Sequence, residues 1–284
     1  MSNLPPPPLP SCYRHADRPT GRSCTRCGRP ACGDCLVSAS VGSHCPECRR
    51  EARPAMTTRA RDWNARQRQP VTSALIGINV AVFVWVILGD AGAAGFGNRV
   101  SPREYDLGLN KYLLQETHEW YRLVTAGFLH FGVLHIAVNM ILLFQLGSML
   151  ERALGPLRFG LLYFAALLGG SLGALIITGD GTGLHGGASG AVFGLMAAAA
   201  IGLQRRGVNI FQTGIGATLV INLLLTFTIP GISIGGHVGG MAVGAVCGFV
   251  MLAPRHKPVP SWLTVVIPVA LGVACVAMSI AVVG

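Results

Sequence analysis

The sequence predicts an all-α protein that crosses a membrane several times and begins with a small cysteine-rich domain. Mean hydropathy is +0.52, and charged residues make up 12% of the chain, against about a quarter in soluble domains. Apolar stretches of about 20 residues follow one another from residue 71 onward, each long enough to cross a bilayer. Seven of the nine cysteines lie within the first 48 residues, before any of these stretches.

Composition divides the chain into four expected segments. These are a disordered Pro-rich tail at 1–11, a cysteine-rich domain at 12–48, an Arg-rich linker at 49–70 and a membrane domain at 71–283. The N-terminus is polar and has no apolar h-region, so no signal peptide is expected. Residues 1–69 hold twelve arginines against five acidic residues, so most of the net charge of +10 precedes the first apolar stretch.

Potential metal ligands in the cysteine-rich domain occur in four pairs, each pair separated by two residues. Such a pair lets two side chains hold one ion, so four pairs suffice for two structural zinc sites with four ligands each. The two-residue spacing favours Cys45 over its neighbour His44. Disulfides are the alternative, and a cytosolic location disfavours them. The expected ligands are Cys12, His15, Cys24, Cys27, Cys32, Cys35, Cys45 and Cys48.

The spacing of these pairs resembles that of B-box-type zinc fingers. The resemblance implies interleaved ligation, in which the first and third pairs share one ion. The two sets would be Cys12, His15, Cys32 and Cys35, and Cys24, Cys27, Cys45 and Cys48. Spacing alone leaves a sequential arrangement open. A cytosolic protein is the expected partner of such a domain.

Seven arginines lie between Arg49 and Arg68, with Trp63 among them, just before the first apolar stretch. A juxtamembrane arginine cluster is typical of contact with anionic lipid headgroups and sets the orientation of the chain. Nucleic acid is disfavoured as a partner, because lysine is absent from this segment and no recognition helix is legible.

Seven membrane spans are expected, and the short loops between them alternate in charge. Basic residues follow the second, fourth and sixth spans and are absent after the third and fifth. The positive-inside rule therefore predicts a cytoplasmic N-terminus and an extracytoplasmic C-terminus. Residues 90–122 are expected to form helical structure at the outer membrane surface. The expected spans are 71–89, 124–150, 157–178, 187–204, 208–229, 234–253 and 262–283.

Polar side chains recur in the outer halves of the second, fourth and sixth spans, which run in the same direction. His135 and Asn139 are four residues apart and share one helix face, while Ser189 and His237 lie on the other two spans. Because an ionisable residue within a span usually faces the bundle interior, we expect one water-accessible cavity. Separate interhelical hydrogen bonds are the alternative. Three further histidines lie at span ends or in loops and receive no role: His118, His130 and His185.

Small residues recur at every fourth position on the fourth and sixth spans. Small side chains at this spacing let two helices approach to backbone contact. The expected packing residues are Gly190, Gly194, Gly236, Gly240 and Gly244.

A serine beside a histidine is sufficient for nucleophilic catalysis. The imidazole of His237 would take the proton of Ser189 as its oxygen attacks a carbonyl, and would then return it to the leaving amine. His135, Asn139 and the backbone N–H of Ser189 are the expected donors to the oxyanion. No metal is implied in this chemistry.

Three motifs taken together resemble those of the rhomboid intramembrane serine proteases. They are His135-x3-Asn139, Gly187-Ala188-Ser189-Gly190 and His237-x2-Gly240-x3-Gly244. The resemblance covers residues 71–283 and implies a bundle of six core transmembrane helices plus a seventh at the C-terminus. It implies a bacterial plasma-membrane protease with Ser189 as nucleophile, His237 as base, and His135 and Asn139 in the oxyanion hole. Its substrates would be membrane-anchored proteins, cut in or near their transmembrane helices.

Two further segments resemble rhomboid signatures: Trp120-Tyr121-Arg122 in the first loop, and Glu151-Arg152, which is expected to be structural. Phe193 departs from the tyrosine that some bacterial rhomboids carry one turn after the serine. The alternative function is that of a catalytically silent rhomboid-fold protein that binds or retains client transmembrane helices. A proton-coupled transporter is disfavoured, because the spans lack acidic residues apart from Glu151 at one end.

Overall fold

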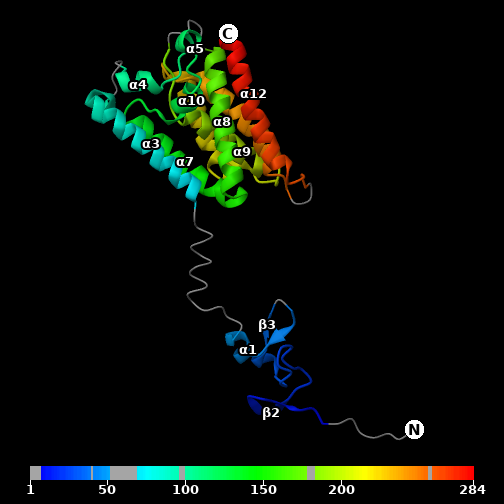
Figure 1. The fold of residues 1–284 in the computed structure, drawn as a ribbon. Helices are drawn as coiled ribbons and strands as arrows, with labels where there is room; N and C mark the ends of the chain where they lie inside the picture. The colour runs from blue at the N-terminus through cyan, green and yellow to red at the C-terminus, as the bar shows by residue number, and fades with distance from the viewer. Residues whose placement is uncertain (1–7, 40, 52–68, 96–99, 178–182, 255–257) are drawn as a thin grey trace. The chain divides into compact units, whose positions relative to one another are not determined.

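The computed structural model describes residues 8–39, 41–51, 69–95, 100–177, 183–254 and 258–284. The chain divides into two compact units, Met1–Gln67 and Arg68–Gly284 (Figure 1). Most of the Pro-rich tail and most of the Arg-rich linker, including the expected lipid contact, lie outside the described residues.

The N-terminal unit has a core built largely of cysteines. Two small antiparallel sheets pair β1 with β2 and β3 with β4. The buried side chains include Cys12 and Cys35 in one cluster and Cys24 and Cys45 in another, with Tyr13 packed against both. A domain this small buries little apolar surface, so its stability depends on other links. Its elements are β1 (Ser11–Cys12), β2 (His15–Pro19), η1 (Gly33–Cys35), β3 (Val37–Ser38), β4 (Ser43–His44) and α1 (Pro46–Glu51).

Among the described residues of the second unit the named elements are all helices, and seven of them are apolar helices of 14 residues or more. These are α3 (Pro70–Gly89), α7 (Val133–Leu154), α8 (Pro156–Ile177), α9 (Ser189–Gln204), α10 (Ile215–Thr228), α11 (Ile234–Met251) and α12 (Leu263–Val283). Short helices connect them: η2 (Ala91–Ala94), α4 (Pro102–Leu107), α5 (Lys111–Thr117), α6 (Arg122–Thr125), η3 (Ala126–Phe128) and η4 (Ile210–Gln212).

Five of these helices, α3, α7, α8, α11 and α12, are long and apolar enough to cross a membrane. The chain is therefore a multi-pass membrane protein. The other two, α9 and α10, have 16 and 14 residues, which at 1.5 Å per residue gives about 24 and 21 Å. Both fall short of the hydrocarbon thickness of about 30 Å. The expected spans at 187–204 and 208–229 are thus shorter helices.

Two span boundaries differ from the sequence prediction. The second span was expected from residue 124, but its helix begins at Val133, because residues 122–128 form α6 and η3 and Gly132 has a φ of 88°. The fifth was expected from residue 208, but α10 begins at Ile215, after η4 and Gly214 with a φ of 77°. Both glycines have a positive φ, which glycine adopts readily, and each separates one helical segment from the next.

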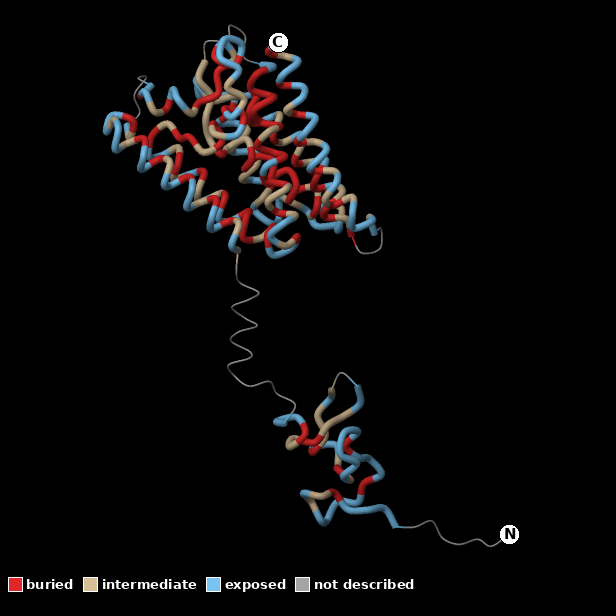
Figure 2. The backbone as a smooth tube through the Cα atoms, in the orientation of Figure 1, coloured by how far each residue is buried: buried red, intermediate tan, exposed pale blue. Residues whose placement is uncertain are grey.

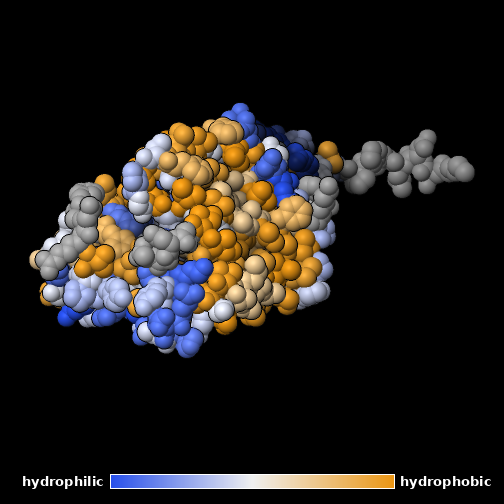
Figure 3. All heavy atoms as spheres, turned by 90° about the horizontal axis from the view of Figure 1, so that it is seen from above, coloured by the Kyte–Doolittle hydropathy of each residue, from blue (hydrophilic) through white to orange (hydrophobic). Residues whose placement is uncertain are grey.

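The centre of the membrane unit is α9, which packs against α7, α8, α10 and α11. Every residue of α9 from Ala191 to Ala200 is buried. The outer helices differ, because only 28% of the apolar window of α3 and 22% of that of α12 are buried, against 61% for α8 (Figure 2). Apolar side chains cover much of the outer surface, as expected for helices that face lipid (Figure 3).

The backbones of α9 and α11 are in direct contact along their glycines. A methyl group added at Gly240 would overlap the carbonyl oxygen of Gly190, and one at Gly244 would overlap that of Gly194. The other side of α11 meets α8 in the same way, where Gly235 faces the carbonyl of Gly173. Helix α11 is therefore held between α8 and α9 by contacts that leave no space for side chains.

Two buried charged side chains stabilise the rest of the membrane unit. Glu151, at the end of α7, accepts hydrogen bonds from the backbone N–H groups of Val71 and Thr72 at 2.9 and 2.8 Å, and so caps α3. Arg122 donates to the carbonyls of Tyr105 and Gly108 and to the Glu119 carboxylate. The hydrogen bond from Arg122 lowers the pKa of Glu119 below its ordinary value.

The glycine contact yields a stability prediction. Gly240→Ala should destabilise the membrane unit by roughly 1–3 kcal/mol, because the added methyl group meets backbone atoms that cannot move aside. Thermal unfolding in detergent measures the change. Gly77→Ala in α3 is the matched control, since no atom lies within 4 Å of a methyl group there. Equal melting temperatures for the two variants would show that the backbones of α9 and α11 do not touch.

Candidate active site

Ser189 is the first residue of α9 and follows a short glycine-containing loop. Gly187 in this loop has a φ of 135°, and its N–H donates to the carbonyl of Ala126 at 2.8 Å. The loop is also paired upstream, where His185 and Leu109 exchange backbone hydrogen bonds of 2.8 Å. Because the first N–H groups of a helix have no intrahelical acceptor, the N–H of Ser189 is available to a bound oxygen.

His237 lies in the first turn of α11, where Ser233 caps the helix by accepting from the N–H of Gly236 at 3.1 Å. Its Nε2 lies 2.8 Å from Oγ of Ser189. The ring stacks on Phe193, with the ring centroids 4.1 Å apart and the planes inclined by 17°. Phe193 is one turn beyond Ser189 on α9, so a single helix supplies both the hydroxyl and the surface against which the imidazole rests.

His135 lies close to the same serine. Its Nδ1 accepts a hydrogen bond from the backbone N–H of Phe131 at 3.3 Å. A neutral imidazole that accepts at Nδ1 carries its hydrogen on Nε2. A methyl group at Gly187 would lie 2.9 Å from that Nε2 and 3.5 Å from Ser189 Oγ. The Nε2–H donor of His135 and the hydroxyl of Ser189 therefore lie on either side of the same small space next to Gly187.

Asn139 lies one turn beyond His135 on α7 and is buried, with 4% of its surface exposed. Its amide donates to the carbonyl of His135 at 2.9 Å. Within the described residues no hydrogen bond joins Asn139 to Ser189 or His237. The structure thus groups Ser189, His237 and His135, whereas the oxyanion role of Asn139 stays a prediction.

A cavity of about 40 Å³ lies beside Ser189. This is enough for more than one water molecule, since one needs roughly 10–15 Å³ of such volume. The polar groups in its wall are suited to holding water. They include the side chains or backbones of Ser171, His185, Gly186, Ser189 and Ser233.

Two residues near Ser189 and His237 received no role in the sequence analysis: His130 was set aside there, and Thr226 was not considered. His130 is fully buried, and its Nε2 accepts from the N–H of Ala188, directly before Ser189, at 3.4 Å. Thr226 on α10 places its Oγ1 2.8 Å from Nδ1 of His237. The sequence feature that could have pointed to His130 is its position five residues before His135, next to the His135-x3-Asn139 motif. For Thr226 the sequence contained no such signal.

Part of the chain, including this site, is similar to a known family of protein domains. Residues 117–254, which include both Ser189 and His237, match the family model for the Rhomboid domain. The chain carries a rhomboid domain.

Three proteins with curated names are similar to part of this chain. The Rhomboid protease GluP of Bacillus subtilis (strain 168) is 33% identical over 140 residues, covering 48% of this chain and 27% of that protein. RHOMBOID-like protein 5 of Arabidopsis thaliana is 36% identical over 149 residues, which cover 51% of this chain and 48% of that protein. The Inactive RHOMBOID-like protein 8 of the same plant is 32% identical over 150 residues, which cover 51% of this chain and 42% of that protein. The similarity thus spans less than half the length of each relative.

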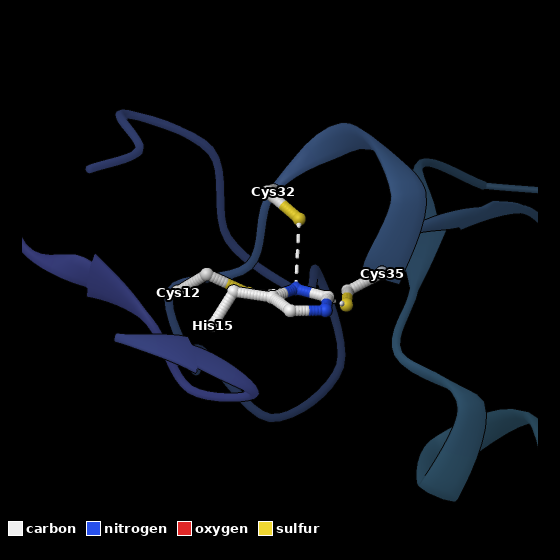
Figure 4. A group of neighbouring side chains, drawn as sticks. All are labelled: Cys12, His15, Cys32 and Cys35. Carbon is white, nitrogen blue, oxygen red and sulfur yellow. Dashed lines mark hydrogen bonds between the residues drawn. The ribbon is translucent and has the colours of Figure 1, made fainter. Parts of the chain in front are cut away.

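Two groups of metal-ligand residues lie before the rhomboid domain, in the N-terminal unit. In each group the four ligand atoms lie within 4.8 Å of one another, so both can hold a metal ion. Figure 4 shows the group formed by Cys12, His15, Cys32 and Cys35. In this group the Cys32 thiol contacts the His15 ring, although the two residues belong to different segments of the chain. The pairs interleave rather than follow one another in sequence, and His44 is in neither group. The groups are Cys12, His15, Cys32 and Cys35, and Cys24, Cys27, Cys45 and Cys48.

Proposed function

We propose that this rhomboid protein is an intramembrane serine endopeptidase with Ser189 as nucleophile and His237 as general base. The 2.8 Å contact between Ser189 Oγ and His237 Nε2 is the observation that carries the proposal. A hydroxyl within hydrogen-bond reach of an imidazole, at the start of a helix and beside a cavity, has the geometry that acyl transfer requires.

In the proposed reaction Ser189 Oγ attacks the carbonyl carbon of the scissile bond while its proton passes to His237 Nε2. The oxyanion would accept from the N–H of Ser189, from Nε2–H of His135 and from the second amide hydrogen of Asn139. His237 then gives its proton to the leaving nitrogen as the C–N bond breaks. Water from the cavity beside Ser189 would hydrolyse the acyl-enzyme, with His237 again acting as base.

The proposed substrate is a membrane-anchored protein, cut in or near its transmembrane helix. The carbonyls of a helix are already bonded and shielded, so the substrate must unwind locally before Ser189 can reach one. The stack of Phe193 on His237 limits rotation of the imidazole, although Phe193 lacks the hydroxyl that a tyrosine would supply.

For the location of the chain we propose the plasma membrane of a bacterium. The charge pattern of the loops favours a cytoplasmic N-terminus and an extracytoplasmic C-terminus. The arginines between Arg49 and Arg68 would then contact anionic lipid headgroups on the cytoplasmic side.

We further propose that each ligand group in the N-terminal unit holds one structural zinc ion, as in a B-box-type finger. Zinc lies about 2.3 Å from sulfur and about 2.0 Å from nitrogen, so a tetrahedral site separates sulfur from nitrogen by about 3.6 Å and two sulfurs by about 3.8 Å. The thiols of Cys12, Cys32 and Cys35 lie 3.8, 3.5 and 3.4 Å from His15 Nδ1. Those of Cys27 and Cys45 lie 3.8 Å apart. Such a domain offers a surface to a cytosolic protein.

The alternative is a catalytically silent rhomboid protein that binds or retains client transmembrane helices. One relative, the Inactive RHOMBOID-like protein 8 of Arabidopsis thaliana, is called inactive in its name. The contact between Ser189 and His237 favours the protease, because a silent scaffold has no need of it.

Three substitutions test the protease proposal. Ser189→Ala should abolish both labelling by a serine-directed fluorophosphonate and cleavage of a model transmembrane substrate. His237→Ala should come close to the same level, because the two residues act as a unit. Asn139→Ala should leave a measurable remainder, since losing one oxyanion donor lowers the rate by about 10²–10³-fold.

The matched control is Ser279→Ala in α12, which removes a buried hydroxyl that donates to the carbonyl of Cys275. It should label and cleave like the wild type, and all variants are first compared by melting temperature in detergent. Cleavage by folded Ser189→Ala at the wild-type rate would refute the dyad. A wild type that neither labels nor cleaves would favour the silent scaffold.

Metal analysis of the full chain tests the zinc proposal. The purified protein should contain about two zinc ions per chain, and Cys24→Ser should retain about one, because that ligand belongs to a single site. Cys275→Ser in α12 should retain both. Chelation should lower the melting temperature of the N-terminal unit, since metal binding and folding are coupled. A purified protein without metal would contradict the proposal. So would a Cys24→Ser variant that binds as much zinc as the wild type.

A further inference from the structure

The catalytic histidine has a second polar partner, which the proposed mechanism does not use. We propose that Thr226 is a positioning residue: its Oγ1 accepts the Nδ1 hydrogen of His237 and keeps Nε2 free to act as base. The proposal rests on the proposed protease function and deepens it, because it names what orients the general base.

Thr226 is buried, with 2% of its surface exposed, and lies near the C-terminal end of α10. Its Oγ1 is 2.8 Å from His237 Nδ1 and 2.7 Å from the carbonyl oxygen of Asn222, one turn earlier on the same helix. A single hydroxyl therefore bridges a backbone carbonyl of α10 and the imidazole of α11.

The direction of these hydrogen bonds follows from what each group can do. A carbonyl oxygen only accepts, so the single hydrogen of the Thr226 hydroxyl is donated to Asn222. The lone pairs of Oγ1 then face Nδ1 of His237, which must be the donor. A neutral imidazole with its hydrogen on Nδ1 has a lone pair on Nε2, the atom that faces Ser189 Oγ. Thr226 thus selects the tautomer that can take the serine proton.

The same contact is suited to the charged state of the reaction. When Nε2 takes the proton of Ser189, both ring nitrogens carry hydrogens, and the Nδ1–H bond to Thr226 becomes charge-assisted and stronger. In serine hydrolases with a triad, a carboxylate holds the Nδ1–H in this way. Neither α10 nor α11 contains an acidic residue. A hydroxyl performs the orienting role here without placing a charge in the apolar bundle.

Four variants separate the hydroxyl from the rest of the side chain. Thr226→Val keeps the shape and removes the hydroxyl, Thr226→Ala removes it without adding bulk, and Thr226→Ser retains it. Thr228→Val is the matched control, because the Thr228 hydroxyl makes the same 2.7 Å bond to the carbonyl four residues earlier but is exposed. The measurements are kcat and KM for a model transmembrane substrate, the rate of fluorophosphonate labelling and the melting temperature.

We expect Thr226→Val and Thr226→Ala to lower kcat and the labelling rate about tenfold with little change in KM, as loss of one hydrogen bond to an imidazolium implies. Thr226→Ser should stay within about twofold of the wild type, since its hydroxyl can make both bonds. Thr228→Val should match the wild type.

Two results would overturn the role of Thr226. One is wild-type kcat in folded Thr226→Val or Thr226→Ala. The other is a Thr226→Ser variant as slow as Thr226→Val, which would assign the effect to packing. A wild type that neither labels nor cleaves is a different outcome: it overturns the proposed protease function, and the positioning role falls with it.

Discussion

The contact between the bare backbones of α9 and α11 is the constraint on which the rest of the membrane unit depends. Ser189 and His237 lie at the same end of these two helices, next to the point where Gly240 meets Gly190. A hydrogen bond of 2.8 Å between side chains as short as serine and histidine requires that the helix axes lie very close. Small residues, here mostly glycine, permit such an approach over several turns. The hydrogen bond between Ser189 and His237 therefore depends on the glycine repeats of the two helices.

The polar groups of the membrane unit are satisfied largely by backbone atoms. Glu151 accepts from the first N–H groups of α3, and Arg122 donates to two carbonyls of the preceding loop. Around the dyad, His135 accepts from the N–H of Phe131, and Thr226 donates to the carbonyl of Asn222. An unpaired polar group in an apolar bundle is costly, and a backbone partner supplies a fixed direction as well as a hydrogen bond. Each side chain is thereby held in one orientation.

The helical membrane fold could be predicted from the sequence, because hydropathy and charge are sufficient to indicate a multi-pass protein. The proximity of Ser189 to His237 could also be predicted, because the glycine repeats indicate which faces of α9 and α11 pack together. Helix boundaries were harder to predict. Residues 124–132 are mostly apolar, although they include Thr125 and His130, but Gly132 interrupts the helix, and a hydropathy pattern carries no information on its φ angle. Thr226 could not be found from the sequence. A threonine within a helix ordinarily bonds to the carbonyl one turn earlier, and nothing in the sequence shows that its other side faces His237.

Metal ions bound at the two interleaved ligand groups would also change the electrostatics of the segment that holds them, residues 8–51. Between residues 8 and 51 the chain has seven arginines and four acidic residues, a formal excess of three positive charges. A divalent ion held by three thiolates and an imidazole leaves one net negative charge, and one held by four thiolates leaves two. With both sites loaded, residues 8–51 are thus formally neutral, although their sequence is basic. The net positive charge before the first membrane helix then resides in residues 52–69, the part of the linker that is nearest to the bilayer along the chain.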